Sequence, residues 1–310
     1  MLGGLEAAFR APRWLPSEAL SVTLRDPRGE RALWLSWARE GASRVGVTAL
    51  SIARAEAPRC ARRTFGAPCL QVEDPWRLRL GRSTVDGTHT RGSLVAGDTS
   101  LAWDLRLEGP PEPPYAHPGS ALRALRGEAS HEGRVALGAF TVDGVEHPVQ
   151  RWAATMTLQR SLPVVGWRAL AVGFDDDPHG HFEAVDLGLL GAPVGFAGLS
   201  FARLLHRGRW LRFEGPAVTN RREVGSLSWR FGFSRGAARL SGEVTAEPFE
   251  AAGLQHENPG GRVTCALHGL LAACRLELSE GERPATHLRA RGCSLEVRTP
   301  DAAHGLLMVG

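Results

Sequence analysis

Lysine is absent from this chain of 310 residues, so every one of its 37 basic residues is an arginine. Chemistry that needs a side-chain amine is therefore excluded, including Schiff-base formation and the lysine of a phosphate-binding loop. The net charge of +4 is modest. The densest basic stretch, residues 203–212, interleaves arginine with leucine and tryptophan, which is typical of a strand with one solvated face. We expect no nucleic-acid partner.

Cysteine is scarce, with five residues and thus an odd number. Residues 1–13 contain no apolar stretch long enough for export, so we expect free thiols, a reducing compartment and a cytoplasmic location. Cys60 and Cys69 share one separation with Cys265 and Cys274, but structural zinc pairs are normally closer, which favours packed thiols. The second pair flanks four residues as opposed positions of a hairpin would.

Long apolar runs are missing too, since no stretch of about 18 apolar residues occurs. We expect no transmembrane segment, while peripheral membrane contact stays open. The chain also lacks the Gly-x-Ser-x-Gly, His-Glu-x-x-His, Gly-x-Gly-x-x-Gly and Cys-x-x-Cys signatures. Their absence counts against the commonest hydrolases, zinc proteases and dinucleotide-dependent enzymes. No cofactor is predicted.

The strongest positive signal is alternation of apolar and polar residues with a period of two, which indicates half-buried antiparallel strands. Turn sequences such as Asp86-Gly87 and Asp143-Gly144 separate these segments, and the chain holds 37 glycines and 20 prolines. Helical periodicity is weak, with short candidates at 120–126 and 196–206. The pattern predicts an all-β protein. Its clearest strands are at 76–80, 99–107, 152–158, 227–233 and 274–278.

Two parts of the sequence echo each other. Residues 76–81 resemble residues 210–215, and each segment is followed by Gly-Ser-Leu and then by a tryptophan. We interpret the echo as two related β units. The predicted boundary lies near residue 160, giving an N-terminal domain at 1–160 and a C-terminal domain at 161–310.

The densest polar cluster lies at residues 175–181. His179 and His181, two apart on an extended segment, could place both imidazoles on one side of a metal ion. Asp175 could instead be a general acid whose pKa is raised by burial. No third metal ligand follows at a fixed spacing, so a solvated turn is the simpler interpretation and no metal site is predicted.

Three further ionisable residues are candidates for acid–base chemistry. Asp104 lies in the middle of a strand, on the face opposite Trp103. A carboxylate there faces either water or a polar cavity, and water is favoured. His256 and Glu257 precede a glycine-rich turn. They could form an acid–base pair at the rim of a barrel, although such residues more often stabilise the turn itself.

Nine tryptophans stand against one tyrosine. Most of these indoles lie in or beside predicted strands, where large rings can fill a β core. Indoles also suit the lining of an apolar pocket, in which a flat ligand stacks and the indole N–H orients one polar atom. Core filling is the simpler interpretation. The candidates for ligand contact are Trp103, Tyr115, Trp152, Trp167 and Trp229.

The order of these features resembles the double-lipocalin group, which includes AttH-like proteins, carotenoid 1,2-hydratases and fungal decalin-forming Diels–Alderases. The C-terminal segments 256–261 and 275–278 are similar to tocopherol cyclases. The resemblance covers roughly half of the chain as a pattern of strands and turns. The N-terminal segments that carry it are 92–94, 101–105, the proline-rich stretch with Tyr115, 133–144 and the strands at Trp152 and Trp167.

The resemblance implies two tandem lipocalin-like barrels or sandwiches with a hydrophobic ligand at or between them. Relatives hydrate, cyclise or isomerise isoprenoid or polyketide chains without a cofactor, or carry lipids. We therefore predict a cyclase, hydratase or isomerase of natural-product biosynthesis that holds its substrate in an apolar cavity and transfers protons through an acid or histidine. A non-catalytic lipid or pigment carrier is the alternative, and a β-sandwich interaction protein with a filled core is a third possibility.

Overall fold

The computed structural model contains no α-helix among the residues that it describes. Its helical segments there are two short 3-10 turns, η1 (Ala67–Cys69) and η2 (Pro248–Glu250). Nearly everything else is antiparallel strand, so the all-β prediction is confirmed. The described residues are 17–40, 43–74, 77–109, 129–161, 164–189, 199–213, 219–224, 227–257, 263–300, 306 and 308–309.

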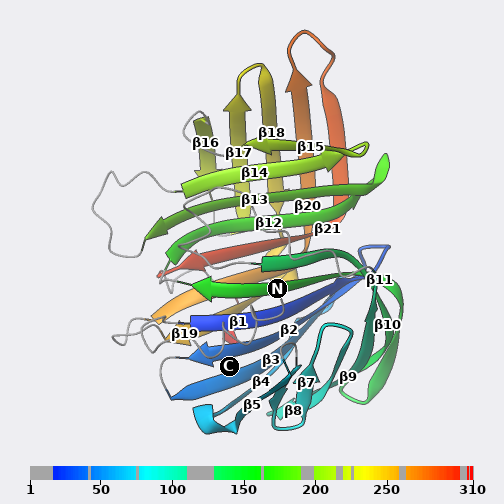
Figure 1. Ribbon diagram of the computed structural model, residues 1–310, viewed down its shortest axis with the longest axis vertical. Coiled ribbons are helices and arrows are strands. Elements are labelled where there is room, and N and C mark those ends of the chain that lie inside the picture. Colours follow the sequence, from blue (N-terminus) through cyan, green and yellow to red (C-terminus); the bar gives the residue numbers. More distant parts are fainter. Residues whose placement is uncertain are drawn as a thin grey trace.

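The N-terminal part forms one nearly closed sheet of eleven strands, which we call sheet A (Figure 1). Its order is β4-β3-β2-β1-β11-β10-β9-β8-β7-β6-β5, so the first strand pairs with the last. The strands are β1 (Ser17–Arg25), β2 (Arg31–Glu40), β3 (Arg44–Ala53), β4 (Arg59–Gly66), β5 (Leu70–Asp74), β6 (Arg77–Leu80), β7 (Ser83–Val85), β8 (His89–Ala96), β9 (Thr99–Glu108), β10 (Ala129–Val142) and β11 (Val145–Ser161).

The C-terminal part forms sheet B, in which the first strand β12 again pairs with the last long strand β21. The order is β15-β14-β13-β12-β21-β20-β18-β17-β16, with β19 and β22 added beside β20. The strands are β12 (Val164–Phe174), β13 (Asp177–Leu189), β14 (Leu199–His206), β15 (Arg209–Phe213), β16 (Thr219–Val224), β17 (Ser228–Arg235), β18 (Ala238–Thr245), β19 (Ala251–Glu257), β20 (Val263–Glu280), β21 (Thr286–Thr299) and β22 (Met308–Val309). The change of sheet falls between β11 and β12, and a domain boundary at residue 160 stays a proposal.

Two local predictions are wrong. The helix expected at 196–206 is a strand from Leu199 to His206, because Ala202 and Leu204 pack with period two into the core of sheet B. The expected hairpin between Cys265 and Cys274 does not exist, since both residues belong to the single strand β20. The packed-thiol interpretation holds for these two, which are buried, while Cys69 is exposed.

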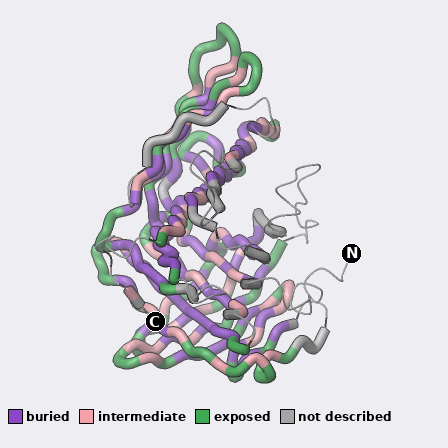
Figure 2. The backbone as a smooth tube through the Cα atoms, turned by 90° about the vertical axis from the view of Figure 1, so that its left-hand side faces the viewer, coloured by how far each residue is buried: buried purple, intermediate pink, exposed green. Residues whose placement is uncertain are grey.

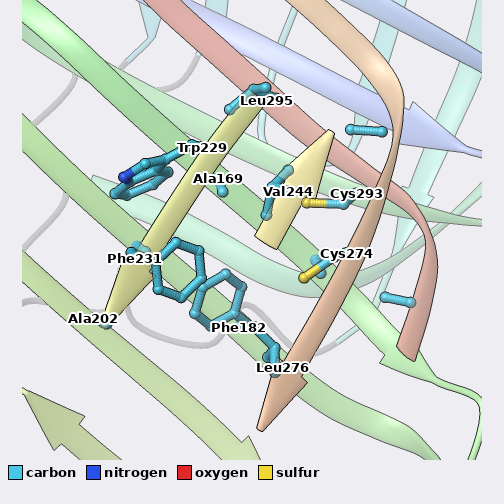
Figure 3. Packing of buried hydrophobic residues seen from close by; sticks show 14 of the residues in the cluster. Ala169, Phe182, Ala202, Trp229, Phe231, Val244, Cys274, Leu276, Cys293 and Leu295 are labelled. Carbon is cyan, nitrogen blue, oxygen red and sulfur yellow. The ribbon is translucent and has the colours of Figure 1, made fainter. Parts of the chain in front are cut away.

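Each sheet encloses its own apolar cluster on one face. Strand β9 shows the alternation that the sequence predicted, because Leu101, Trp103, Leu105 and Leu107 are buried while Asp104 is exposed. In sheet B, the Trp229 indole lies over Ala169, and the neighbouring Phe182 and Phe231 rings stack at 5.5 Å (Figure 3). The small alanine side chain leaves room for the indole.

The two sheets contact each other through a third cluster, which joins β2 and β3 to β19 and β20. Strand β20 shows why this contact forms. Its first half is buried on both faces, whereas its second half alternates between buried and exposed residues. In Figure 2 the buried backbone, in purple, runs through the region between the two ends of the molecule. The third cluster consists of Ala32, Leu50, Ile52, Ala252, Leu270 and Leu271.

Arginine side chains of sheet A add polar contacts across this boundary. Nη1 of the buried Arg25 donates to the carbonyl oxygens of Leu170 at 2.9 Å and Gly292 at 2.7 Å. Nη1 of Arg54 donates to the buried Glu250 carboxylate at 3.0 Å. These bonds satisfy polar groups that the contact between the sheets removes from water, and they fix one sheet against the other.

Gly138 provides a direct test of how closely β9 and β10 approach. It follows a register shift in β10 and has a φ of 131°. A Cβ added there would overlap the carbonyl oxygen of Asp104. We expect Gly138→Ala to lower the free energy of unfolding by about 2–3 kcal/mol, measured by urea denaturation. Gly87→Ala, with open space around the added Cβ, is the control. Equal midpoints for the two variants would contradict this geometry.

Candidate functional site

Sheet B carries a chain of charged residues on the face opposite its apolar cluster. Arg168 lies between Trp167 and Ala169, both of which pack into that cluster, so alternation directs Arg168 to the other face. Glu183 lies likewise between Phe182 and Ala184. Charged side chains are seldom buried unless they are paired. We call this chain the ionic row, and it consists of Arg203, Glu183, Arg168, Glu296, Arg298 and His268.

Glu183 is the centre of one half of the ionic row. Its Oε2 accepts hydrogen bonds from Nε and Nη2 of Arg203 at 2.8 and 2.7 Å, and its Oε1 accepts from Nη2 of Arg168 at 3.0 Å. Arg203 is only 1% exposed and Glu183 2%. The Arg203 guanidinium also lies over the Trp210 ring, 5.2 Å from its centroid. The pair is thus stabilised by several partners rather than by one.

Glu296 and His268 form the other half of the row. The register of the sheet places Arg168, Glu296 and His268 directly opposite one another on β12, β21 and β20. Nε of Arg298 donates to Glu296 Oε1 at 2.7 Å. Burial would raise the pKa of Glu296, but Arg298, His268 and Arg168 lower it to well below its ordinary value. Glu296 is therefore a carboxylate at neutral pH.

His268 lies where the row meets sheet A. Its ring packs against the Trp34 indole of β2, with centroids 4.5 Å apart. Burial is the main cause that lowers the pKa of His268, Glu296 opposes this effect, and Arg298 adds to it. The residue is 5% exposed, and its Nε2 has no hydrogen-bond partner among the residues that the structure describes. A neutral imidazole with an unsatisfied nitrogen can accept or donate one further hydrogen bond.

Apolar residues share this face of sheet B with the ionic row. Leu170, Val185 and Phe201 alternate with residues of the opposite cluster and are at most 8% exposed. The face is therefore both buried and amphipathic. It can surround an apolar molecule and offer charged or hydrogen-bonding groups to one of its polar atoms.

The structure separates the acid–base candidates that the sequence suggested. Asp104 is on the exposed face of sheet A, where its carboxylate lies 2.7 Å from His89 Nε2, and its side chain is 61% exposed. Asp175 and His179 are exposed at the β12–β13 turn and its edge. His181 is buried on the face of the ionic row and contacts the Trp210 ring. Roles for these residues stay predictions.

The remaining candidates do not gather at one place. His256 and Glu257 end β19, and their side chains, like all of Tyr115, lie outside the described residues. Trp103 and Trp152 pack in the cluster of sheet A, whereas Trp167 and Trp229 pack in that of sheet B. Nε1 of Trp103 donates to Thr90 Oγ1 at 3.0 Å. These are the contacts of core residues, and a ligand role for the four indoles stays a prediction.

Sequence reasoning missed the most unusual polar positions. Asp186 is fully buried on the apolar face of sheet B, where the Ser200 hydroxyl donates to its Oδ1 at 2.5 Å. Glu183, Asp186 and His268 share one signal, which is a charged or titratable residue inside a segment whose other residues are apolar or small. The alternation pattern alone could not say which of the two faces of such a strand is buried.

Two structural searches give no further site. No group of three His, Cys, Asp or Glu side chains in the described part of the chain is placed to hold a metal ion. No helix among these residues is long and apolar enough to cross a membrane. The ionic row, with His268 at its end, therefore stands as the candidate site.

Comparison with solved structures decides the fold family. A protein from Nitrosomonas europaea that is provisionally assigned as AttH is 14% identical, with a TM-score of 0.56 over 94% of this chain and 95% of that chain. Kievitone hydratase from Nectria haematococca is 10% identical, with a TM-score of 0.57 over 91% and 88% of the two chains. This chain has the AttH-like double-lipocalin fold.

A third double-lipocalin neighbour was solved with a bound small molecule. CghA with Sch210972 is 12% identical, with a TM-score of 0.58 over 93% of this chain and 89% of that one. No family model and no curated protein matches the sequence. The predicted resemblance is thus confirmed at the level of the fold, and one of its solved examples is a hydratase.

Proposed function

We propose that this protein is an enzyme that hydrates, cyclises or isomerises a hydrophobic small molecule, with His268 as the proton-transfer group. One observation carries the proposal. His268 is a buried imidazole with an unsatisfied Nε2, and it lies between the ionised Glu296 and the Trp34 indole at the contact of the two sheets. A histidine oriented by a carboxylate is a common arrangement for general acid–base catalysis.

The three reactions share one requirement, which is the movement of a proton without any change in oxidation state. Neutral His268 accepts a proton from a substrate C–H or O–H group, or from a water molecule that attacks a double bond. The Glu296 carboxylate stabilises the imidazolium that forms. The same proton then returns to a carbon or oxygen of the product. The balance needs no cofactor, in agreement with the prediction from the sequence.

The fold supports the choice of substrate class. Kievitone hydratase shares the fold, and CghA was solved with Sch210972. Leu170, Val185 and Phe201 supply an apolar surface beside the ionic row. We propose an isoprenoid- or polyketide-like substrate of natural-product biosynthesis, processed in the cytoplasm. Lipid or pigment carriage without turnover is the alternative, and the experiment below distinguishes the two.

The test is turnover by the purified protein in an organic extract of its source organism. Substrate and product are identified by mass spectrometry as pairs of compounds that differ by one water or have equal mass. We expect His268→Gln to reduce the rate of conversion by about 100-fold or more, the usual contribution of a general acid–base group. His287→Gln is the matched control, because His287 lies on β21 beside Glu277 but is exposed.

Each outcome decides between the proposals. Conversion by the wild type and by His287→Gln, but not by a folded His268→Gln, supports the enzyme. Undiminished conversion by His268→Gln would refute the role of His268. A compound that the protein retains and releases unchanged, with no conversion of any component, would favour the carrier.

A further inference from the structure

Glu183 occupies a position from which it can control the whole ionic row. It uses one carboxylate oxygen for Arg203 and the other for Arg168, at distances of 2.7 and 3.0 Å. The Arg203 side chain is 2% exposed and that of Glu183 is 3%. Because both carboxylate oxygens are occupied, Glu183 restrains two guanidinium groups at once.

Arg168 transmits this restraint to the proposed catalytic pair. It lies opposite Glu296 in the sheet, and Glu296 lies opposite His268. Five neighbouring strands, β14, β13, β12, β21 and β20, each contribute a member of this sequence of contacts. Within the described residues, no other acidic side chain has a printed ion pair with Arg168. The position of Arg168 relative to Glu296 is therefore set from the Glu183 side.

We propose that Glu183 is a positioning residue for His268: by holding Arg168, it keeps Glu296 oriented toward the imidazole. This inference rests on the proposed function of His268 for its catalytic meaning. The coupling itself is a property of the contacts and can be measured without a substrate. Glu183 does not have to touch the substrate in this arrangement.

The charged groups around His268 fix the sign of the expected effect. Glu296 and Arg298 face it from β21, and Arg168 follows on β12. Its partner on β19 is Ala252, and sheet A presents the uncharged Trp34. In Glu183→Gln, Arg168 loses its carboxylate and pairs more closely with Glu296. His268 then has less negative charge available, so protonation of its ring requires a lower pH.

The test follows the His268 ring by NMR as the pH is varied, with the signal assigned through His268→Gln. We expect Glu183→Gln to move the titration midpoint of His268 to lower pH by about 0.5 or more. Arg168→Gln should move it to higher pH, since a positive charge is removed. The exposed His287 serves as an internal control, and its midpoint should stay the same in every variant.

Glu183→Asp separates positioning from charge and covers the case in which Glu183→Gln does not fold. Aspartate keeps the charge but is one methylene shorter, so it cannot hold both arginines in the same way. A shifted His268 midpoint in Glu183→Asp supports positioning. A shift in Glu183→Gln but none in Glu183→Asp would overturn it, as would no shift in either. If His268→Gln keeps full turnover while these shifts occur, the proposed function fails and the coupling stands.

Discussion

Replacing Arg203 with methionine is expected to lower the free energy of unfolding by about 3–5 kcal/mol. Methionine can fill much of the volume of the arginine stem, but it leaves the Glu183 carboxylate without the two hydrogen bonds from Arg203. Glu183 is 2% exposed, so water cannot replace them. The variant also loses the contact between the guanidinium and the Trp210 ring. Urea denaturation gives the measurement.

A pair with similar geometry but different burial provides the control. Nε of Arg230 donates to Glu243 Oε1 at 2.8 Å, while the Arg230 side chain is 65% exposed. Arg230→Met should cost at most about 1 kcal/mol, because solvent screens an exposed pair. If the two variants lost the same stability, burial would not be the reason for the strength of the Arg203–Glu183 contact.

Trp229→Ala is expected to have an effect of the same size, about 3–5 kcal/mol, for a different physical reason. The indole is fully buried in the cluster of sheet B, 4.9 Å from Phe231 between ring centroids. Small residues such as Ala169 lie under it (Figure 3), and they cannot move far enough to close the cavity. The loss is therefore the transfer free energy of the ring plus the cost of the empty space.

Thermal denaturation and urea denaturation should agree on this loss. Phe249→Ala is the control, since Phe249 is an aromatic residue of the same half that is 57% exposed; a change within about 0.5 kcal/mol is expected there. A Trp229→Ala variant as stable as the wild type would show that sheet B already contains enough space for the rings to rearrange. That result would favour the interior of sheet B as a ligand site.

The fold could be predicted because period-two alternation is a local property. In β9 and β17, large apolar residues recur at every second position, and the structure buries those positions. Turn residues are local as well. Asp143 and Gly144 have φ values of 49° and 85°, which permit the tight turn between β10 and β11. These features need no knowledge of distant parts of the chain.

The candidate site could not be predicted because it depends on contacts between distant residues. His268 pairs with Glu296 across β20 and β21, and its other neighbour, Trp34, is more than two hundred positions away in the sequence. In the sequence, Glu183 could equally have been a solvated residue on the outer face of a strand. Only the assembled sheets show that this face is buried.

The internal echo was a partial guide. Both sheets join their first strand to their last, which is a repeat of topology. The echoed segments themselves contribute to β6 and β15, which hold different places in the two sheet orders. Alternating strands resemble each other wherever they occur, so the similarity of letters did not identify equivalent strands.

The burial pattern of β20 has a consequence for how the two halves depend on each other. Leu270 and Leu271 belong to a strand whose hydrogen bonds all lie in sheet B, yet they are kept from water by Ala32, Leu50 and Ile52 of sheet A. Cutting the chain between the sheets would break no strand pairing but would expose a greasy patch on each product. Either half expressed alone would therefore carry a sticky surface, and the backbone ladder would give no warning of it.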